Sequence, residues 1–258
     1  EPLTAWISIQ LGGRLVKLDV PREETFVCNR IRHAIRYHIT SWMRPDGSFA
    51  ARTFKAWCNN GAYSSHGHAI AAKGLNAFPQ LYPCDNIDGE TWTVYTNRSV
   101  AGAMRGYGMP QASYAFECHA EDCARAMKMD PLEFRRKNLM PVGYYHAFSK
   151  NELYSDTFNQ CFDKGAEIIG YYDKVKKYAN QTGDIRRGIA VSTFWYNTAV
   201  YPIALETSSC RIVMNQDGSV QFQLGETEIG QGADTAAAQM IADTLGIPVS
   251  RVNIKATT

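Results

Sequence analysis

The strongest constraint on the fold is a hairpin signal in the first quarter of the chain. Residues 33–43 and 48–58 are rich in β-branched and aromatic side chains, and Arg44-Pro45-Asp46-Gly47 separates them. An Asp-Gly pair between two such runs is typical of a tight turn, because glycine readily adopts the left-handed backbone that the turn requires. We therefore predict two adjacent antiparallel strands over these residues.

Helical and extended segments are mixed along the rest of the chain, without a regular strand–helix–strand alternation. Asp130, followed by Pro131 and Glu133, predicts a helix start, since aspartate caps the first turn and proline fits its first position. This mixture predicts an α+β fold with mixed sheets and packed helices, and no internal repeat is visible. Further predicted helices cover 1–11, 68–78, 111–127, 158–178 with interruptions at Gly165 and Gly170, and the stretch from 234 to 246; further strands cover 14–20, 92–95, 188–200, 203–214, 220–224 and 252–255; turns or loops are predicted at 21–24, 59–61 and 143–156.

The composition excludes several classes of protein. The 258 residues carry 27 Lys and Arg against 25 Asp and Glu, a formal net charge of +2, so no nucleic-acid-binding surface is indicated. No apolar run approaches the roughly 18 residues that span a bilayer. The first residues show no basic segment followed by an apolar one, as a signal peptide would. We expect no nucleic acid and no membrane among the partners.

The seven cysteines are scattered and include no C-x-x-C pair. Their odd number and wide spacing argue against a disulfide framework, a structural zinc site and an iron–sulfur cluster on this chain. We therefore expect reduced thiols in a cytoplasmic protein.

An arginine and a tyrosine flanked by glycines stand just before a predicted helix, in the segment Met104-Arg105-Gly106-Tyr107-Gly108. The planar guanidinium of Arg105 suits an oxyanion or a phosphate. The glycines allow a ligand to approach the backbone closely, and they leave the ring of Tyr107 free to project. The same pattern also fits a structural turn with a surface arginine.

A second glycine-rich segment, Gly230-Gln231-Gly232, lies between a predicted strand and a predicted helix. Backbone N–H groups at a helix start favour anions, and the Gln231 amide can donate and accept hydrogen bonds. The alternative is a tight turn in which Asp234 is a plain N-cap. Glu226 and Glu228 are either solvated turn carboxylates or, in one case, a group that reaches a ligand pocket.

Two further groups also have two interpretations. His66-Gly67-His68 has the spacing of a metal-binding pair on a strand, but no third ligand is near in the sequence, which favours hydrogen bonding in a loop. Trp195, Tyr196 and Tyr201 either line a substrate funnel or fill the core between strands.

Taken together, these segments resemble the molybdenum-binding subunit of the xanthine dehydrogenase family, in its bacterial form. The resemblance covers nearly the whole chain and keeps the order of the motifs. The resemblance rests chiefly on two segments, Asn97–Gln111, which contains the motif Met-Arg-Gly-Tyr-Gly, and Thr227–Thr235. Four shorter segments support it: Arg22–Phe26, Asn60–Tyr63, Ser65–His68 and Asp130–Arg135.

The resemblance implies a molybdenum hydroxylase that oxidises a purine such as xanthine or hypoxanthine, with water as the source of oxygen. It implies a molybdenum–molybdopterin cofactor, as such or as the cytosine dinucleotide, from which electrons pass to iron–sulfur clusters and FAD on partner domains or subunits. The other expected partners are a small heteroaromatic substrate and the remainder of the molybdenum subunit. The rival interpretations are a relative that acts on an aldehyde or another N-heterocycle, and a non-catalytic scaffold domain.

Residue roles follow from the same resemblance. Arg105 matches the arginine whose loop contacts the molybdenum cofactor, and Tyr107 matches the aromatic residue that stacks on the substrate ring. Gly230 and Gln231 match the loop that hydrogen-bonds the pterin. A second stacking aromatic of animal enzymes falls near 198–201 without a clean match.

The resemblance also places several groups outside this chain. The glycine- and phenylalanine-rich loop at molybdenum and an upstream glutamine belong before Glu1, and the general-base glutamate belongs after Thr258. We therefore expect no catalytic residue and no direct metal ligand on this chain, and a part that does not catalyse alone. We expect the chain to be the central part of a molybdopterin-binding region, with both termini truncated and two subdomains, 1–185 and 186–258.

Overall fold

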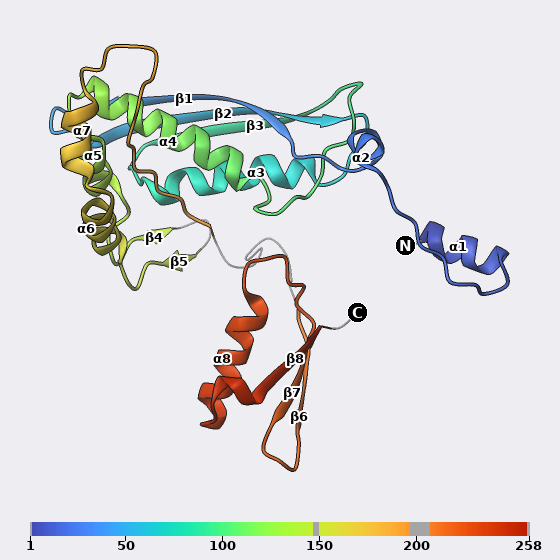
Figure 1. The fold of residues 1–258 in the computed structure, drawn as a ribbon. Coiled ribbons are helices and arrows are strands. Elements are labelled where there is room, and N and C mark those ends of the chain that lie inside the picture. Colours follow the sequence, from blue (N-terminus) through green and yellow to red (C-terminus); the bar gives the residue numbers. More distant parts are fainter. Residues whose placement is uncertain (1, 147–149, 197–206, 257–258) are drawn as a thin grey trace. The chain divides into compact units, whose positions relative to one another are not determined.

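A computed structural model describes residues 2–146, 150–196 and 207–256 (Figure 1). The chain divides into two compact units, Glu1–Tyr196 and Asn197–Thr258, which are described separately. Among the described residues, no helix combines the length and the apolar character needed to cross a membrane.

The first unit is built on a three-stranded sheet, in the order β1 (Ala34–Met43), β2 (Phe49–Gly61) and β3 (Ile87–Tyr95). β1 and β2 are antiparallel, which confirms the predicted hairpin. Gly47 has a φ of 84°, and the Asp46 carboxylate accepts a hydrogen bond from the backbone N–H of Ser48 at 3.0 Å. The Asp-Gly pair therefore closes the turn by the mechanism that the sequence indicates.

β3 pairs with β2 in parallel, and α3 (Gly67–Leu81) forms the crossover between them. The helix runs two residues past Pro79, where we expected it to end. A proline near the end of a helix removes one hydrogen bond without stopping the last turn. α3 and β3 thus form a strand–helix–strand unit that the sequence analysis did not predict.

The second unit repeats this topology on a smaller scale. Its sheet has the order β6 (Cys210–Met214), β7 (Val220–Leu224) and β8 (Val252–Ala256), the first pair antiparallel and the second parallel. α8 (Ala233–Leu245) and the short 3-10 helix η1 (Val249–Arg251) connect β7 to β8. The α+β class with mixed sheets is confirmed, although each unit contains one parallel crossover.

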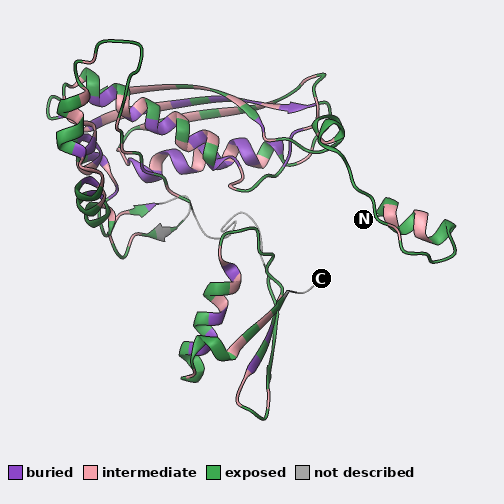
Figure 2. Ribbon diagram, in the orientation of Figure 1, coloured by how far each residue is buried: buried purple, intermediate pink, exposed green. Residues whose placement is uncertain are grey.

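Helices cover one face of the sheet of the first unit, as Figures 1 and 2 show. α4 (Met109–Ala126) packs against α3, and α5 (Pro131–Asn138) packs against α4. The predicted cap of α5 is confirmed, because the Asp130 carboxylate accepts hydrogen bonds from two backbone N–H groups of the first turn. The main apolar core lies between sheet and helices and contains Phe54, Ala56, Ala77, Phe78, Met109, Ala112 and Phe116.

A buried polar cluster ties α4 to its neighbours. Glu117 on α4 forms an ion pair with Arg135 on α5, with Oε2 and Nε 2.8 Å apart. The same carboxylate accepts hydrogen bonds from the Tyr82 hydroxyl at 2.5 Å and from the backbone N–H of Thr193 at 2.7 Å. Because buried charges need such partners, this cluster fixes where α4 lies.

Two tryptophans from neighbouring strands stack on each other in the first unit. Trp57 on β2 and Trp92 on β3 are register partners, with ring centroids 5.1 Å apart and planes inclined by only 9°.

The N-terminal segment differs from the expectation in two places. α1 (Pro2–Gln10) ends before Gly12 and Gly13 as predicted, but the predicted strand 14–20 is extended chain without a strand partner. α2 (Arg22–Cys28) forms where a turn was expected. Pro21 ahead of two acidic residues is a helix start, because carboxylates favour the first turn.

The remaining differences concern short elements. Residues 59–61 continue β2, and β4 (Tyr145–His146) pairs with β5 (Asn151–Glu152) inside the expected loop. The helical stretch 158–178 breaks only at Gly170, whose φ is 62°, into α6 (Phe158–Ile169) and α7 (Tyr171–Tyr178), whereas Gly165 lies within α6. Residues 188–196 contain no strand, and the expected features at 197–206, including Tyr201, lie outside the described residues.

Candidate functional site

The loops that follow β2 and β3 lie side by side, because the carboxyl ends of parallel strands meet at one edge of a sheet. Ala62 donates its backbone N–H to the Arg98 carbonyl at 3.1 Å, and Ala101 donates to the Asn60 carbonyl at 3.0 Å. Ala101 also forms a parallel bridge with Ile31. The segment that carries Arg105 and Tyr107 is therefore anchored to the loop that begins α3.

The backbone around Tyr107 is left-handed at three successive residues. Gly106, Tyr107 and Gly108 have φ values of 92°, 46° and 92°. A Cβ atom on Gly106 would lie 2.7 Å from Pro110 Cδ, and one on Gly108 would lie 2.8 Å from the Ile70 carbonyl oxygen. Both glycines are thus required by conformation and by space, and Tyr107 is held in an uncommon conformation between them.

The Tyr107 side chain meets α3. Its hydroxyl oxygen lies 2.7 Å from His66 Nδ1, and the two rings form an edge-on contact with centroids 5.9 Å apart. Burial and the neighbouring phenol of Tyr196 raise the pKa of Tyr107, so its hydroxyl stays protonated near neutral pH. The Lys73 ammonium lies over the ring of Tyr196, 5.1 Å from the ring centroid, in a cation–π contact.

Arg105 is exposed, and its backbone is held by a second arginine. Arg32 donates one N–H to the Arg105 carbonyl at 2.7 Å and another to the Gln111 side chain at 3.3 Å. Gln111 in turn donates to the backbone carbonyl of His33 at 3.0 Å. Sequence reasoning missed Arg32, because 73 residues separate it from the carbonyl that it binds.

The loop Gly230-Gln231-Gly232 lies in the second unit, and the carboxylate of the nearby Glu228 accepts hydrogen bonds from its backbone. Glu228 accepts hydrogen bonds from the backbone N–H groups of Gly230 at 2.6 Å, Gly232 at 3.2 Å and Asp234 at 3.2 Å. These donated hydrogen bonds lower the pKa of Glu228. The N-cap of α8 is Gly232 rather than Asp234, which lies in the first turn.

Gln231 bonds within the same loop. Its amide donates to the Thr227 carbonyl at 2.9 Å and accepts from the backbone N–H of Ile229 at 2.6 Å. The space beside Gly232 is open, since a Cβ atom built there meets no atom within 4 Å. A ligand at this loop would meet an open glycine edge, the amide of Gln231 and a carboxylate.

The other candidates of the sequence analysis have clear positions. Trp195 packs against the buried aromatic clusters, which favours the core interpretation for this residue. His66 and His68 belong to no metal-binding group, and the described ranges contain no cluster of three His, Cys, Asp or Glu that could hold a metal ion.

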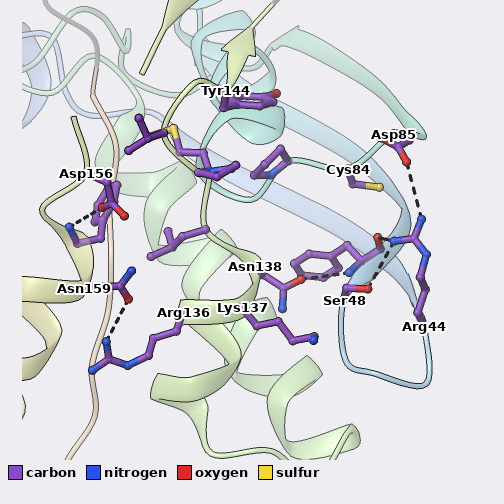
Figure 3. Close-up of a pocket in the computed structure, with 17 residues that line it drawn as sticks. Arg44, Ser48, Cys84, Asp85, Arg136, Lys137, Asn138, Tyr144, Asp156 and Asn159 are labelled. Carbon is purple, nitrogen blue, oxygen red and sulfur yellow. Dashed lines mark hydrogen bonds and ion pairs between the residues drawn. The ribbon is translucent and has the colours of Figure 1, made fainter. Parts of the chain in front are cut away.

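A cavity of about 550 Å³ lies elsewhere in the first unit, beside the β1–β2 turn and the end of α5 (Figure 3). Its cations have acidic or amide partners: Arg44 lies 3.8 Å from Asp85, and Arg136 donates to Asn159 at 3.0 Å. Lys137 lies 3.1 Å from Asp46. No residue predicted to bind a ligand lines this cavity.

The chain is similar to several known proteins. It is 40% identical over 257 residues to the xanthine dehydrogenase molybdenum-binding subunit of Escherichia coli O157:H7. The matched stretch covers 100% of this chain and 34% of that protein. It is 27% identical over 247 residues to xanthine dehydrogenase of Drosophila pseudoobscura pseudoobscura, covering 95% of this chain and 18% of that protein. The chain thus spans about a third or less of the length of these relatives.

Solved structures share the fold. Quinoline 2-oxidoreductase from Pseudomonas putida 86 superposes with a TM-score of 0.79 at 23% identity, covering 98% of this chain and 34% of that one. Aldehyde oxidoreductase from Desulfovibrio desulfuricans superposes with a TM-score of 0.70 at 26% identity, covering 88% of this chain and 25% of that one. Two family models, both described as a molybdopterin cofactor-binding domain, match this chain, one over residues 1–139 and the other over residues 164–258. The chain therefore belongs to the molybdopterin cofactor-binding domain family.

Proposed function

We propose that this chain is part of a molybdenum hydroxylase that hydroxylates a purine, xanthine or hypoxanthine, with oxygen taken from water. The observation that carries the proposal is the glycine-flanked Arg105–Tyr107 loop, in a chain 40% identical to a protein named xanthine dehydrogenase molybdenum-binding subunit. An aromatic side chain and an exposed guanidinium, two residues apart in one loop, suit a planar heteroaromatic ring and an anionic cofactor respectively.

The proposed cofactor-binding residues are Arg105 in the first unit and Gly230 and Gln231 in the second. In the first unit, the Arg105 guanidinium suits a phosphate such as that of a molybdopterin. In the second unit, the Gln231 amide suits a hydrogen-bonding ring edge, and a ligand at the Gly230 N–H would have to replace Glu228, which accepts that hydrogen bond at 2.6 Å. The open space beside Gly232 supports this fit. When bound, the molybdenum cofactor would supply the redox chemistry of the hydroxylation, and iron–sulfur clusters and FAD on partner domains or subunits would accept the electrons.

Tyr107 orients the substrate in this proposal. Stacking of two aromatic rings is worth about 0.5–1.5 kcal/mol beyond the area buried, so its main effect is to hold the ring in a reactive orientation. The general-base glutamate is proposed to lie outside this chain, so the described residues bind and orient without moving the reacting proton. The odd number and wide spacing of the seven cysteines support a cytoplasmic location within the proposal.

A different substrate class is the main alternative. The solved structures with this fold include proteins named quinoline 2-oxidoreductase and aldehyde oxidoreductase. Turnover of xanthine, hypoxanthine, nicotinate and benzaldehyde by the complete purified enzyme separates these classes, and a lack of purine turnover would overturn the purine assignment. A purified complex without molybdenum would favour the non-catalytic scaffold.

The role of Arg105 is tested by replacing it in the complete enzyme. Arg105→Ala should lower the molybdenum content per protein, measured by elemental analysis, together with the turnover. Arg125→Ala is the matched control, because Arg125 is an exposed arginine on α4 that lies 3.3 Å from Glu121. Wild-type molybdenum content and turnover in Arg105→Ala would refute the assigned role.

A further inference from the structure

We propose that His66 is a positioning residue that sets the orientation of the Tyr107 ring and thereby the affinity for ring-shaped substrates. This inference rests on the proposed function, in which Tyr107 stacks on a heteroaromatic substrate. The structure contributes the pairing itself, which joins the start of α3 to a loop 41 residues later.

The backbones of both partners are fixed. His66 is the N-cap residue of α3, and its carbonyl accepts hydrogen bonds from Ala69 and Ile70 at 3.1 Å each. Gly67, the next residue, accepts a hydrogen bond from the Thr93 hydroxyl at 3.1 Å. On the other side, the Tyr107 N–H donates to the Met104 carbonyl at 2.8 Å.

The side chain of Tyr107 has freedom that the backbone does not remove. Its two side-chain torsions can swing the ring away from the loop, and the ring is only half-buried. The 2.7 Å contact at the hydroxyl end and the edge-on imidazole, with ring planes at 81°, each oppose this movement. With its proton on Nε2, the neutral imidazole accepts the hydrogen bond of the tyrosine hydroxyl through Nδ1.

A positioning role predicts a selective loss. Without the histidine, Tyr107 samples several orientations, and a ring substrate must select the stacking one, which raises its KM. A substrate without a ring makes no use of the stack. Because His66 is exposed and water can replace it, loss of this hydrogen bond should raise KM for a ring substrate about two- to fivefold, with a smaller change in kcat.

The experiment compares His66→Leu, His66→Gln and Tyr107→Phe in the complete molybdenum enzyme, with a heteroaromatic substrate and a small aliphatic aldehyde. His66→Leu should raise KM for the ring substrate and leave that for the aldehyde unchanged, whereas His66→Gln, which keeps an acceptor, should restore most of the affinity. In the Tyr107→Phe background, His66→Leu should have a smaller effect than in the wild type, because the hydroxyl partner is absent and only the edge-on ring contact is left to lose. His68→Leu, at an exposed histidine two residues along the chain, is the matched control.

A second measurement does not depend on turnover. With tyrosines labelled by ¹³C at the phenol carbon, the Tyr107 signal, identified by its loss in Tyr107→Phe, should shift in His66→Leu and stay near its wild-type position in His68→Leu. An unshifted signal, or equal losses for both substrates in His66→Leu, would overturn the positioning role. Absence of molybdenum-dependent turnover in the wild type would overturn the proposed function, with the labelled signal still reporting on the contact.

Discussion

The buried ion pair between α4 and α5 gives a quantitative test of how the Tyr107 loop is supported. α4 begins two residues after Tyr107, and Glu117 and Arg135 fix its middle with side chains that are 9% and 2% exposed. In Arg135→Met, Glu117 would remain buried without its cation. Breaking one side of a buried pair costs about 3–5 kcal/mol.

The remaining contacts of Glu117 place the expected loss at the low end of this range. The Tyr82 hydroxyl and the backbone N–H of Thr193 still donate to the carboxylate at 2.5 and 2.7 Å. We therefore expect Arg135→Met to lower the free energy of unfolding by about 3 kcal/mol. In a domain of this size, that corresponds to a fall in Tm of about 6–12 °C.

Thermal and urea unfolding of the full chain, followed by circular dichroism, measures this loss. The double variant Glu117→Gln/Arg135→Met should be more stable than the sum of the single losses implies, because it no longer buries an unpaired charge. Lys164→Met is the control: Lys164 and Glu167 lie 2.9 Å apart but are 69% and 71% exposed, so the expected cost is about 0.5 kcal/mol or less. A loss below about 1 kcal/mol in Arg135→Met, or strict additivity, would refute the reasoning.

Two further predictions concern acid stability and the second loop. Burial, reinforced by the charge of Arg52, lowers the pKa of His119 below its ordinary 6.5, so its contribution to the free energy of unfolding is complete above pH 6.5 and is lost as the pH falls from 6.5 toward the folded pKa. In urea unfolding at several pH values, His119→Gln should therefore lose less stability in acid than the wild type does. If His119→Gln is as acid-sensitive as the control His38→Gln, in which an exposed histidine is replaced, the assignment is contradicted. Glu228→Ala removes the acceptor of three backbone N–H groups and should speed amide hydrogen exchange at Gly230, Gly232 and Asp234 about tenfold. Glu226→Ala is the control, and exchange rates in Glu228→Ala that match those in Glu226→Ala would show that the Glu228 carboxylate does not organise the loop.

The sequence predicts the elements whose signals are local. The turn at Asp46-Gly47, the cap at Asp130 and the helix end at Gly246 all depend on neighbouring residues, and all three are confirmed. The failures are non-local. Residues 14–20 alternate like a strand, but no neighbouring strand pairs with them, and the parallel pairing of β2 with β3 joins segments separated by a whole helix.

In the candidate site too, the features set by neighbouring residues could be predicted, and those set by residues far apart in the chain could not. Gly106 and Gly108 could be singled out from the sequence, because glycine next to a functional loop indicates unusual backbone geometry. The contacts of Arg32 and His66 could not, because they join residues 73 and 41 positions apart in the chain, and no local pattern indicates such pairs. The sequence leaves Glu228 either as a solvated turn carboxylate or as a group that reaches a ligand pocket, because its hydrogen bonds to the backbone N–H groups depend on the exact path of the loop.

The parallel indoles of Trp57 and Trp92 give the crossover a built-in optical reporter. Rings stacked at this separation couple their excited states, which produces a paired signal in circular dichroism and alters the fluorescence. The signal survives only while β3 stays in register beside β2, so it records the docking of the strand that leads into the Arg105 loop. Assembly of this edge of the sheet can therefore be followed in real time without any bound cofactor or substrate.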